Sequence, residues 1–280
     1  MNRVLILGAS GFIGNAIYKE LLPYFNVSGT YFSSKPEFDD NKVLYKFDME
    51  KDNINTILEK VQPNYIISSL RGDFESQYNI HQQLVEYTLE QEKCRLLYLS
   101  TVNVFDAKHE FPSYESDSVL AESEYGRFKV SVEKLIATLP QSKYTILRLP
   151  LVLGVNSPRL IQLKKASQHQ ADFEVYPNLI VSITTADKIA QQIHYIINKN
   201  KVGIFHLASN DVIHHSDLFK ELSEILSLNK VIFRQIFTSN EEAYLAILPK
   251  ENKLPRNYRI TVSQVINDCT LKEEITTLIK

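Results

Sequence analysis

The 280-residue chain carries 31 Lys and Arg against 33 Asp and Glu, so its formal net charge is −2, and 44% of its residues are hydrophobic. This balance excludes a strongly basic protein drawn to nucleic acid or to an anionic membrane surface, and the length allows one large domain or two unequal ones. Cys94 and Cys269 show no metal-ligand spacing, so neither a disulfide framework nor a metal centre is predicted.

The N-terminus, "MNRVLILGAS", has one basic residue and a short apolar run that stops at a glycine. That run is too short for a secretion signal or a membrane span, so we predict a buried strand and no membrane partner. Together with the few cysteines, this favours a cytoplasmic protein.

Short apolar runs alternate with longer amphipathic segments over the first half of the chain. The runs predict buried strands at residues 3–8, 26–32, 42–48, 64–70, 94–105 and 143–154. Helical periodicity fills the gaps, at residues 12–22, 52–62, 76–93 and 123–139. Because strands joined by helical crossovers form parallel sheets, we predict an α/β protein with a doubly wound parallel sheet of the Rossmann type, the fold that binds NAD(P) where a glycine-rich loop follows the first strand.

The pattern becomes less regular after Gly154. Residues 169–200 predict two short strands and a helix, 202–209 another strand, and 215–228 another helix. We therefore predict a Rossmann domain of residues 1–153 plus about 179–208, and a smaller substrate-binding lobe of residues 154–178 and 209–280.

Three glycines follow the first predicted strand in the stretch "GASGFIG". Gly8 permits a tight turn, Gly11 lets a pyrophosphate approach the backbone, and Gly14 lets the helix pack on the strand. The helix N-terminus then offers free N–H groups to phosphates. A turn of small residues without a ligand is the alternative, but the strand before and the helix after favour a dinucleotide site. The rest of this site is predicted at Ser10, Phe12 and Ile13.

The residues after the second strand distinguish the two nicotinamide cofactors. An NAD site usually has a carboxylate there for the ribose 2′-hydroxyl. The stretch "GTYFSSK" instead has Thr30, Ser33, Ser34 and Lys35, with no carboxylate before Glu37. Hydroxyls and a lysine suit a 2′-phosphate, so we predict NADP(H) in preference to NAD(H), although Lys35 is also compatible with a solvated loop.

Other strand ends are predicted to complete the cofactor site, because ligands bind at the carboxyl ends of the strands in open α/β sheets. Asp48 is a candidate partner of the adenine amino group, or alternatively the cap of the next helix. The remaining candidates at strand ends are Ser68, Ser69, Leu70 and Pro150.

A hydroxyl, a phenol and an amine follow the fifth predicted strand. Thr101 lies near its end, Tyr125 comes 24 residues later, and Lys129 follows four positions further on. Residues four apart share one helix face, so Tyr125 and Lys129 can point into the same cleft. A free phenol has a pKa near 10, and a nearby ammonium group lowers it, so we predict that Lys129 lowers the pKa of Tyr125. Such a phenol can act as an acid towards a carbonyl oxygen that Thr101 orients.

With these features the chain resembles the extended short-chain dehydrogenase/reductase superfamily, and within it the dTDP-4-dehydrorhamnose reductase group of sugar-nucleotide-binding proteins. The matching stretches are "GASGFIG", "YLSTVNVFD", "YESDSVLAESEYGRFKVSVEKLI", "RLPLVLG", "GIFHLAS" and "LPRNYRITVSQV". The resemblance implies that Tyr125 and Lys129 are the catalytic pair, with Lys129 also holding the nicotinamide ribose and therefore belonging to the cofactor site together with Tyr125. In the group that the chain resembles, the hydroxyl residue lies three positions before the valine of this stretch. The resemblance therefore assigns Val104–Phe105 to that stretch and Thr101, not Ser100, to the hydroxyl residue.

The chain departs from the superfamily pattern at two places. Val102 and Asn103 stand where the dehydratases that it resembles have two carboxylates, which disfavours dehydration. Arg71 follows the fourth strand, where the family has a small, alanine-rich turn; we interpret it as a contact for a phosphate or a substrate carboxylate, or else as a surface loop residue. Arg148 and His206 lie among apolar residues, and we interpret them as a buried ion-pair partner and a hydrogen-bonded core histidine.

The substrate candidates are polar residues at predicted strand ends or in the second lobe. Guanidinium geometry suits a sugar-nucleotide diphosphate, which favours the arginines among them. The candidates are Arg71, Asn103, Asn156, Arg159 and Arg256.

The resemblance implies an NADPH-dependent reductase of a keto group on a nucleotide-activated deoxysugar, with Tyr125 as the proton donor. Its expected partner is the small-molecule nucleotide sugar, without nucleic acid, and the family allows a monomer or a homodimer. Two alternatives stay open. One is a non-catalytic NADP-binding subunit resembling the regulatory subunit of methionine adenosyltransferase, and the other is a nucleotide-sugar epimerase that keeps its cofactor bound.

Overall fold

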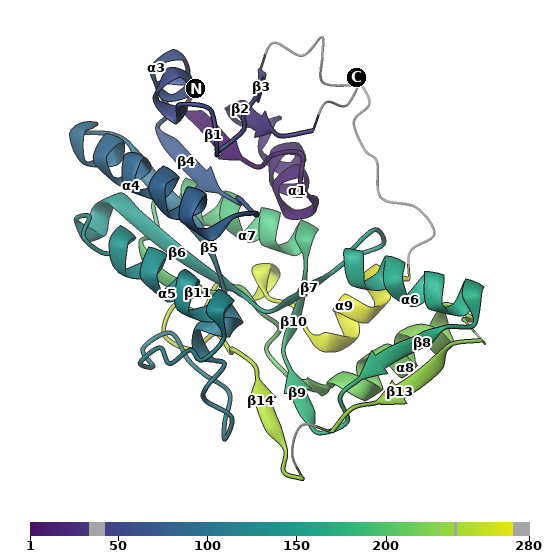
Figure 1. The fold of residues 1–280 in the computed structure, drawn as a ribbon. Coiled ribbons are helices and arrows are strands. Elements are labelled where there is room, and N and C mark those ends of the chain that lie inside the picture. The colour runs from purple at the N-terminus through teal and green to yellow at the C-terminus, as the bar shows by residue number, and fades with distance from the viewer. Residues whose placement is uncertain (34–42, 229, 238–239, 271–280) are drawn as a thin grey trace.

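A seven-stranded sheet forms the centre of the molecule in a computed structural model that describes residues 1–33, 43–228, 230–237 and 240–270 (Figure 1). The strand order is β11-β6-β5-β4-β1-β2-β3, and every neighbouring pair runs parallel. The strands are β1 (Arg3–Leu7), β2 (Asn26–Tyr31), β3 (Leu44–Lys46), β4 (Tyr65–Ser68), β5 (Arg95–Thr101), β6 (Tyr144–Leu149) and β11 (Gly203–His206). The predicted parallel α/β sheet is confirmed.

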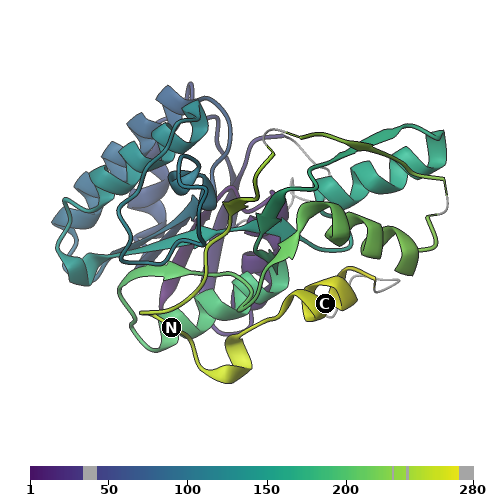
Figure 2. The ribbon, with the colours of Figure 1, turned by 90° about the horizontal axis from the view of Figure 1, so that it is seen from below.

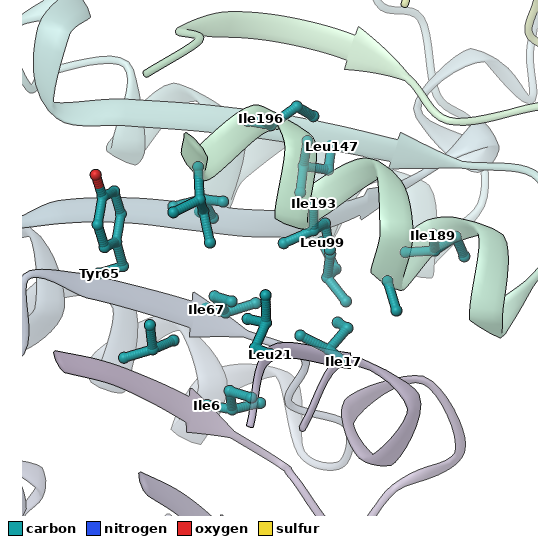
Figure 3. Close-up of a cluster of buried hydrophobic side chains, with 14 of the residues drawn as sticks. Ile6, Ile17, Leu21, Tyr65, Ile67, Leu99, Leu147, Ile189, Ile193 and Ile196 are labelled. Atoms are coloured by element: carbon teal, nitrogen blue, oxygen red, sulfur yellow. The ribbon is translucent and has the colours of Figure 1, made fainter. Parts of the chain in front are cut away.

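Helices cover both faces of this sheet, because its strands are apolar on both sides. One face carries α1 (Phe12–Leu21) and α7 (Ala186–Asn198), and the other carries α3 (Ile54–Val61), α4 (Phe74–Glu90) and α5 (Glu124–Ile136). Figure 3 shows the first core, where side chains of α1 and α7 meet those of the strands. Those labelled there are Ile6, Ile17, Leu21, Tyr65, Ile67, Leu99, Leu147, Ile189, Ile193 and Ile196. Burial of each large aliphatic side chain stabilises the fold by roughly 1.5–3 kcal/mol.

The strand order reverses direction at β1, which lies between β2 and β4. The chain first adds β2 and β3 on one side and then crosses back to add β4 on the other. Leu7 and Ser68 are register partners, so the loops that follow β1 and β4 leave the sheet side by side. Ligands of open α/β sheets bind at such a reversal point.

The predicted sixth strand, residues 143–154, is divided in two. β6 ends at Leu149, and the chain then forms β7 (Leu151–Leu153), which pairs with β10 (Ile183–Thr185) outside the main sheet. Pro150 lies at the break; proline has no N–H to donate to a ladder of hydrogen bonds.

Smaller sheets and three helices form the remaining part of the molecule. In Figure 2 this part lies on the opposite side of the molecule from α4 and α5. Its strands are β8 (Asp172–Val175), β9 (Leu179–Val181), β12 (Ile213–His214), β13 (Ile232–Gln235) and β14 (Ala243–Leu245). Its helices are α6 (Pro158–His169), α8 (His215–Ile225) and α9 (Val262–Cys269). The sequence predicts α8 but only two strands in residues 169–200, where the structure has β8, β9 and β10.

Several elements of this part are absent from the sequence prediction, namely α6, α9 and the strands β12 to β14. These strands have two to four residues and pair with distant segments, β12 and β14 with β9 and β13 with β8. Such short pairings leave little periodicity to read. No helix in the described ranges is both long and apolar enough to span a bilayer.

Candidate active site

A cleft of about 300 Å³ opens where β1, β4, β5 and β6 end. It brings together the three predicted catalytic residues, seven predicted residues from the cofactor loops and two substrate candidates. Its lining residues are Gly11, Phe12, Ile13, Gly14, Ser69, Leu70, Arg71, Leu99, Ser100, Thr101, Tyr125, Lys129, Leu149, Pro150, Leu151, Val152, Pro158 and Arg159.

The glycine loop is packed so closely against the end of β4 that side chains are excluded from it. Gly8 has a φ of +80°, and a Cβ there would lie 2.9 Å from the Ser69 carbonyl oxygen. A Cβ on Gly14 would overlap the Gly8 carbonyl oxygen and lie 2.8 Å from Ser69 Oγ. Ser69 Oγ in turn donates a hydrogen bond to the Leu7 carbonyl, 2.7 Å away. The loop therefore forms a backbone-lined cradle.

The first turn of α1 is free to receive an anion. Its N-cap residue, Gly11, makes no side-chain cap hydrogen bond, and the first turn contains no acidic residue. Gly11, Phe12 and Ile13 line the cleft, and unpaired N–H groups with the positive end of the helix dipole stabilise phosphate there. The donor set and the cradle both fit a dinucleotide pyrophosphate.

Thr30 has a different place from the one predicted for a 2′-phosphate ligand. Its side chain is 2% exposed, and its hydroxyl accepts a hydrogen bond from the Gly8 N–H at 2.9 Å. Thr30 therefore holds the glycine loop from beneath. Ser33 is exposed just after β2, whereas Ser34 and Lys35 lie outside the described residues.

Ser68 and Asp48 are both engaged by neighbouring protein groups. Ser68 is buried beneath the cleft, where its hydroxyl donates to Nε2 of His81 at 2.9 Å, while Nδ1 of His81 donates to the Gln77 carbonyl at 2.6 Å. Burial lowers the pKa of His81 to about 4, so this ring is neutral. Asp48 forms an ion pair with Lys51 at 3.3 Å.

The cap of α3, which was an alternative role for Asp48, is Asn53, whose side chain accepts a hydrogen bond from the Asn55 N–H. Asp48 instead accepts the N–H of Glu50 in the turn before the helix. Ser10 lies in the glycine loop and is partly exposed.

Thr101 ends β5 and begins a short 3₁₀ turn, η1 (Val102–Phe105). Its hydroxyl donates to Oδ1 of Asn103 at 3.0 Å and accepts the Asn103 N–H at 3.3 Å, which fixes its direction. Tyr125 lies in the first turn of α5, a turn capped by Ser123. The strand end and the helix start therefore present Thr101 and Tyr125 to one cleft.

The electrostatics of Tyr125 differ from the prediction. Burial raises the pKa of Tyr125, and its hydrogen bond with Thr101 and the charge of Arg71 only partly oppose this. Lys129 Nζ donates to the Leu99 carbonyl at 3.1 Å and lies 5.8 Å from the centre of the Tyr125 ring. The ammonium group of Lys129 is thus directed at β5, and the net effect on Tyr125 is a raised pKa instead of the predicted lowered one.

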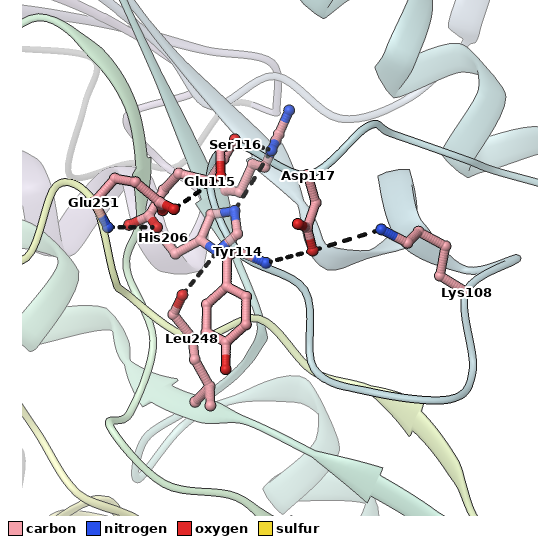
Figure 4. A network of polar contacts seen from close by, with 9 residues as sticks. Lys108, Tyr114, Glu115, Ser116, Asp117, His206, Leu248 and Glu251 are labelled. Carbon is pink, nitrogen blue, oxygen red and sulfur yellow. Dashed lines mark hydrogen bonds and ion pairs between the residues drawn. The ribbon is translucent and has the colours of Figure 1, made fainter.

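Ser100, the hydroxyl that the sequence pattern sets aside, is engaged by Glu133. Its Oγ donates to Oε1 of Glu133 at 2.5 Å, and Glu133 pairs with Arg148 at 2.8 Å. Arg148 is thus the buried ion-pair partner that the sequence predicts. His206, also as predicted, is a core histidine, with Nδ1 donating to the Leu248 carbonyl at 3.2 Å (Figure 4).

The five substrate candidates are not all in one place. Arg71 and Arg159 line the cleft, but the Arg159 guanidinium already donates to the Glu174 carbonyl at 2.8 Å. Asn103 is not among the described residues that line the cleft, but it is hydrogen-bonded to Thr101, which is. Asn156 is exposed in the turn before α6 and is absent from the lining set among the described residues.

The prediction for Arg256 is not supported by its position. Arg256 is exposed in η3 (Arg256–Tyr258), which packs on α7 through the rings of Tyr258 and Tyr195, 4.4 Å apart. It is not part of the cleft lining within the described ranges. The sequence stretch "LPRNYR" therefore lies against α7 and away from the cleft.

Some cleft residues escape the sequence reasoning. The wall formed by Leu149–Val152 and by Pro158 depends on the break at Pro150, which periodicity does not reveal. Glu133, which bonds to Ser100 of the cleft lining, could have been found from the sequence, since it lies four residues after Lys129 on the same helix face. Within the described residues, no cluster of three or more His, Cys, Asp or Glu side chains is placed to hold a metal ion.

Comparisons with known proteins identify the family of this chain. A family model described as the RmlD substrate binding domain matches residues 73–274. The dTDP-4-dehydrorhamnose reductase of Aggregatibacter actinomycetemcomitans is 25% identical over 224 residues, which cover 74% of this chain and 73% of the relative.

Two solved structures show the same fold. The dTDP-4-dehydrorhamnose reductase of Bacillus anthracis, in complex with NADP, has a TM-score of 0.72 at 17% identity and covers 96% of this chain and 98% of its own. The enzyme WbmH of Bordetella bronchiseptica, in complex with NAD⁺, has a TM-score of 0.78 at 16% identity, with 96% and 97% covered. The chain belongs to the RmlD substrate-binding-domain family of the extended short-chain dehydrogenases/reductases.

Proposed function

We propose that the protein is an NADPH-dependent reductase of a keto group on a nucleotide-activated deoxysugar. Its family places it among the NAD(P)-dependent oxidoreductases of the extended short-chain type. The observation that carries the proposal is the single cleft in which Thr101, Tyr125 and Lys129 lie beside the glycine cradle. The name of the relative supports a nucleotide-activated 4-keto deoxysugar as the substrate.

The glycine cradle and the first turn of α1 would hold the pyrophosphate, and Lys129 would bind the nicotinamide ribose hydroxyls. NADPH, when bound, supplies the hydride. Tyr125 donates its phenolic proton to the carbonyl oxygen, and its raised pKa keeps that proton in place at neutral pH until it is needed. Thr101, whose hydroxyl donates to Asn103 in this structure, would redirect that proton to the carbonyl oxygen and so orient it. Lys129, whose ammonium group lies close by, stabilises the phenolate as it forms.

Several side chains favour reduction over other chemistry of this superfamily. Val102 is 6% exposed and packs in an apolar cluster with Val104 and Phe105, so η1 offers no carboxylate for dehydration. Arg71, an exposed residue of the cleft lining, is the guanidinium that we assign to an anionic group of the substrate. Asn103, Asn156 and Arg159 remain candidate substrate contacts.

We propose NADP(H) as the preferred nicotinamide cofactor. The absence of a carboxylate between Thr30 and Glu37 supports this preference. If Lys35 binds the 2′-phosphate, Lys35→Ala weakens NADPH binding at least tenfold and leaves NADH binding almost unchanged. Isothermal titration with both cofactors measures this, and equal losses for the two would remove the assignment.

We also propose the division of the chain into a Rossmann domain, residues 1–153 with about 179–208, and a substrate-binding lobe, residues 154–178 and 209–280. The packing of α7 against α1 and of β11 against β6 supports the return of the chain to the first domain. β9 lies at the start of that returning stretch, and it pairs with β12 and β14 of the smaller sheets.

The decisive experiment follows NADPH absorbance while the purified protein is incubated with a panel of nucleotide-4-keto sugars. Tyr125→Phe should abolish turnover and leave the NADPH dissociation constant nearly unchanged. Tyr24→Phe, an exposed tyrosine outside the cleft, serves as the matched control.

The other outcomes identify other functions. Intact NADPH binding without turnover of any sugar would contradict the reductase and favour a non-catalytic NADP-binding subunit. Cofactor that stays bound through purification, together with an isomerised sugar product, would favour an epimerase.

A further inference from the structure

A buried carboxylate lies one helical turn beyond Lys129. Glu133 is 5% exposed, and two of its contacts come from Arg148, whose Nη2 lies 2.8 Å from Oε2 and whose Nε donates to Oε1 at 3.1 Å. This two-pronged geometry is the strong form of an arginine–carboxylate pair. The ion pair therefore holds the Glu133 side chain in one orientation.

Arg148 is itself fixed from its far side. Its Nη1 donates to the Glu115 carbonyl at 3.4 Å and to Nε2 of His206 at 3.5 Å. Burial and the charge of Arg148 lower the pKa of His206 to about 3, so its ring is neutral and Nδ1–H donates to the Leu248 carbonyl. Figure 4 shows Glu115, His206 and Leu248 converging at this point. The far side of Arg148 is thus held by hydrogen bonds within the protein.

Glu133 also holds the strand that carries the catalytic threonine. Ser100 Oγ donates to Oε1 of Glu133, and Ser100 is the residue directly before Thr101 in β5. Glu133 lies in α5 and Arg148 in β6, so one carboxylate joins α5, β5 and β6 at the cleft.

The carboxylate of Glu133 also affects the charge state of Lys129. Lys129 is 5% exposed, and burial lowers its pKa to about 8; the charge of Glu133 opposes that change and Arg71 adds to it. On the β5 side, Lys129 Nζ lies 4.6 Å from the centre of the Tyr98 ring, and α4 contributes the neutral His81.

Among the residues that the structure describes, the other titratable groups around Lys129 do not supply a negative charge at neutral pH. Burial raises the pKa of Tyr98 well above its ordinary value, and that of Tyr125 is raised as well, so both phenols are uncharged. Arg148, on β6, is positive but is paired with Glu133.

We propose that Glu133 is a positioning residue, which keeps Lys129 in its ammonium form at neutral pH and holds the Ser100–Thr101 strand end against α5. The inference deepens the proposed function, since it is the ammonium form that binds the ribose hydroxyls and stabilises the phenolate of Tyr125. Glu133 acts through Lys129 and Thr101 without touching the substrate.

The test measures the titration of Lys129 directly. Protein labelled with ¹³C at the lysine side chains is titrated by NMR without cofactor or substrate, and the signal is assigned with Lys129→Met. Removing an opposite charge lowers the pKa of a lysine by about one unit or more, so in Glu133→Gln the midpoint should fall from about 8 to about 7 or below. Glu124→Gln, an exposed carboxylate on the same helix, should leave it in place.

A folded Glu133→Gln protein in which Lys129 titrates at the wild-type midpoint would overturn the proposal. If the single variant does not fold, the double variant Glu133→Gln with Arg148→Met leaves no unpaired charge, and its Lys129 midpoint should still fall, by a smaller amount. An unchanged or raised midpoint there would equally overturn it.

This titration needs no turnover, so its result stands even if the reductase assay fails. Where turnover is present, the high-pH limb of kcat/KM should move down by the same amount as the Lys129 midpoint. A purely structural role for Glu133 would lower the rate at every pH without moving that limb.

Discussion

The backbone of Gly126 packs directly on the carbonyl oxygen of Asn103, at a distance that leaves no room for a side chain. A Cβ at position 126 would overlap that oxygen and would lie 2.8 Å from Oδ2 of Asp106. Asp106 also accepts the Glu122 N–H at 2.7 Å and the Ser123 hydroxyl. The start of α5 is therefore clamped on the turn after β5, and this clamp sets Tyr125 beside Thr101.

Gly126→Ala should be destabilising although alanine is the better helix former. Helix propensity favours alanine by about 1 kcal/mol, but the overlap with fixed backbone costs roughly 1–3 kcal/mol and displaces Tyr125. We expect a lower urea midpoint and a loss of kcat of at least tenfold, with NADPH affinity largely kept. Arg127→Ala, at an exposed neighbouring position, is the control. A more stable, fully active Gly126→Ala protein would show that the helix start is not clamped.

The sequence predicted those features of the site that depend on residues close together in the chain. The spacing in "GASGFIG" is tied to the backbone contacts of Gly8 and Gly14, and the four-residue spacing of Tyr125 and Lys129 places them on one helix face. The pairing of Glu133 with Arg148 joins distant segments, and no pattern in either segment names the partner. The wrong expectation for the pKa of Tyr125 has the same origin, because spacing alone does not show that Lys129 turns towards the Leu99 carbonyl.

A substitution at Thr30 can distinguish a residue that supports the glycine loop from one that binds the 2′-phosphate of the cofactor. Thr30→Val keeps the shape of the side chain but leaves the Gly8 N–H without its partner, which costs roughly 1–3 kcal/mol of stability. We expect NADPH and NADH binding to weaken by the same factor, as measured by titration calorimetry, and Thr30→Ser to restore both. Selective loss of NADPH binding would instead place Thr30 at the 2′-phosphate.

The buried ammonium group of Lys129 should lower the stability of the protein at neutral pH. Because burial lowers its pKa from 10.5 to about 8, the folded state binds fewer protons than the unfolded state between these values, and stability rises with pH across that window. At pH 7 the protonated amine destabilises the fold by on the order of 3 kcal/mol at most. Lys129→Met should therefore be inactive but more stable at pH 7, with its advantage shrinking towards pH 10 in urea unfolding. Lys134→Met, at an exposed site on α5, should show no such trend.

Three buried histidines should make the fold sensitive to mild acid. Burial lowers the pKa of His81 and His215 to about 4 and that of His206 to about 3, whereas in the unfolded chain they titrate near 6.5. The unfolded state therefore binds more protons, and stability present above pH 6.5 is lost as the pH falls towards 4. We expect the urea midpoint to fall between pH 7 and pH 5, and less steeply in His81→Gln. His109→Gln, an exposed histidine, should retain the wild-type slope; an equal slope in all three proteins would contradict the assignment.

The break at Pro150 also limits how this molecule can be divided. There the chain leaves the seven-stranded sheet for the smaller ones, and it returns through α7 to β11. It leaves again for β12, and after β14 it passes the Glu115 region before α9 packs back on α8 and β10. Neither part is a continuous piece of chain, so neither can be expressed alone by truncation. A chimaera that takes the smaller sheets and their helices from a relative would need several matched junctions, and a single crossover would leave both parts incomplete.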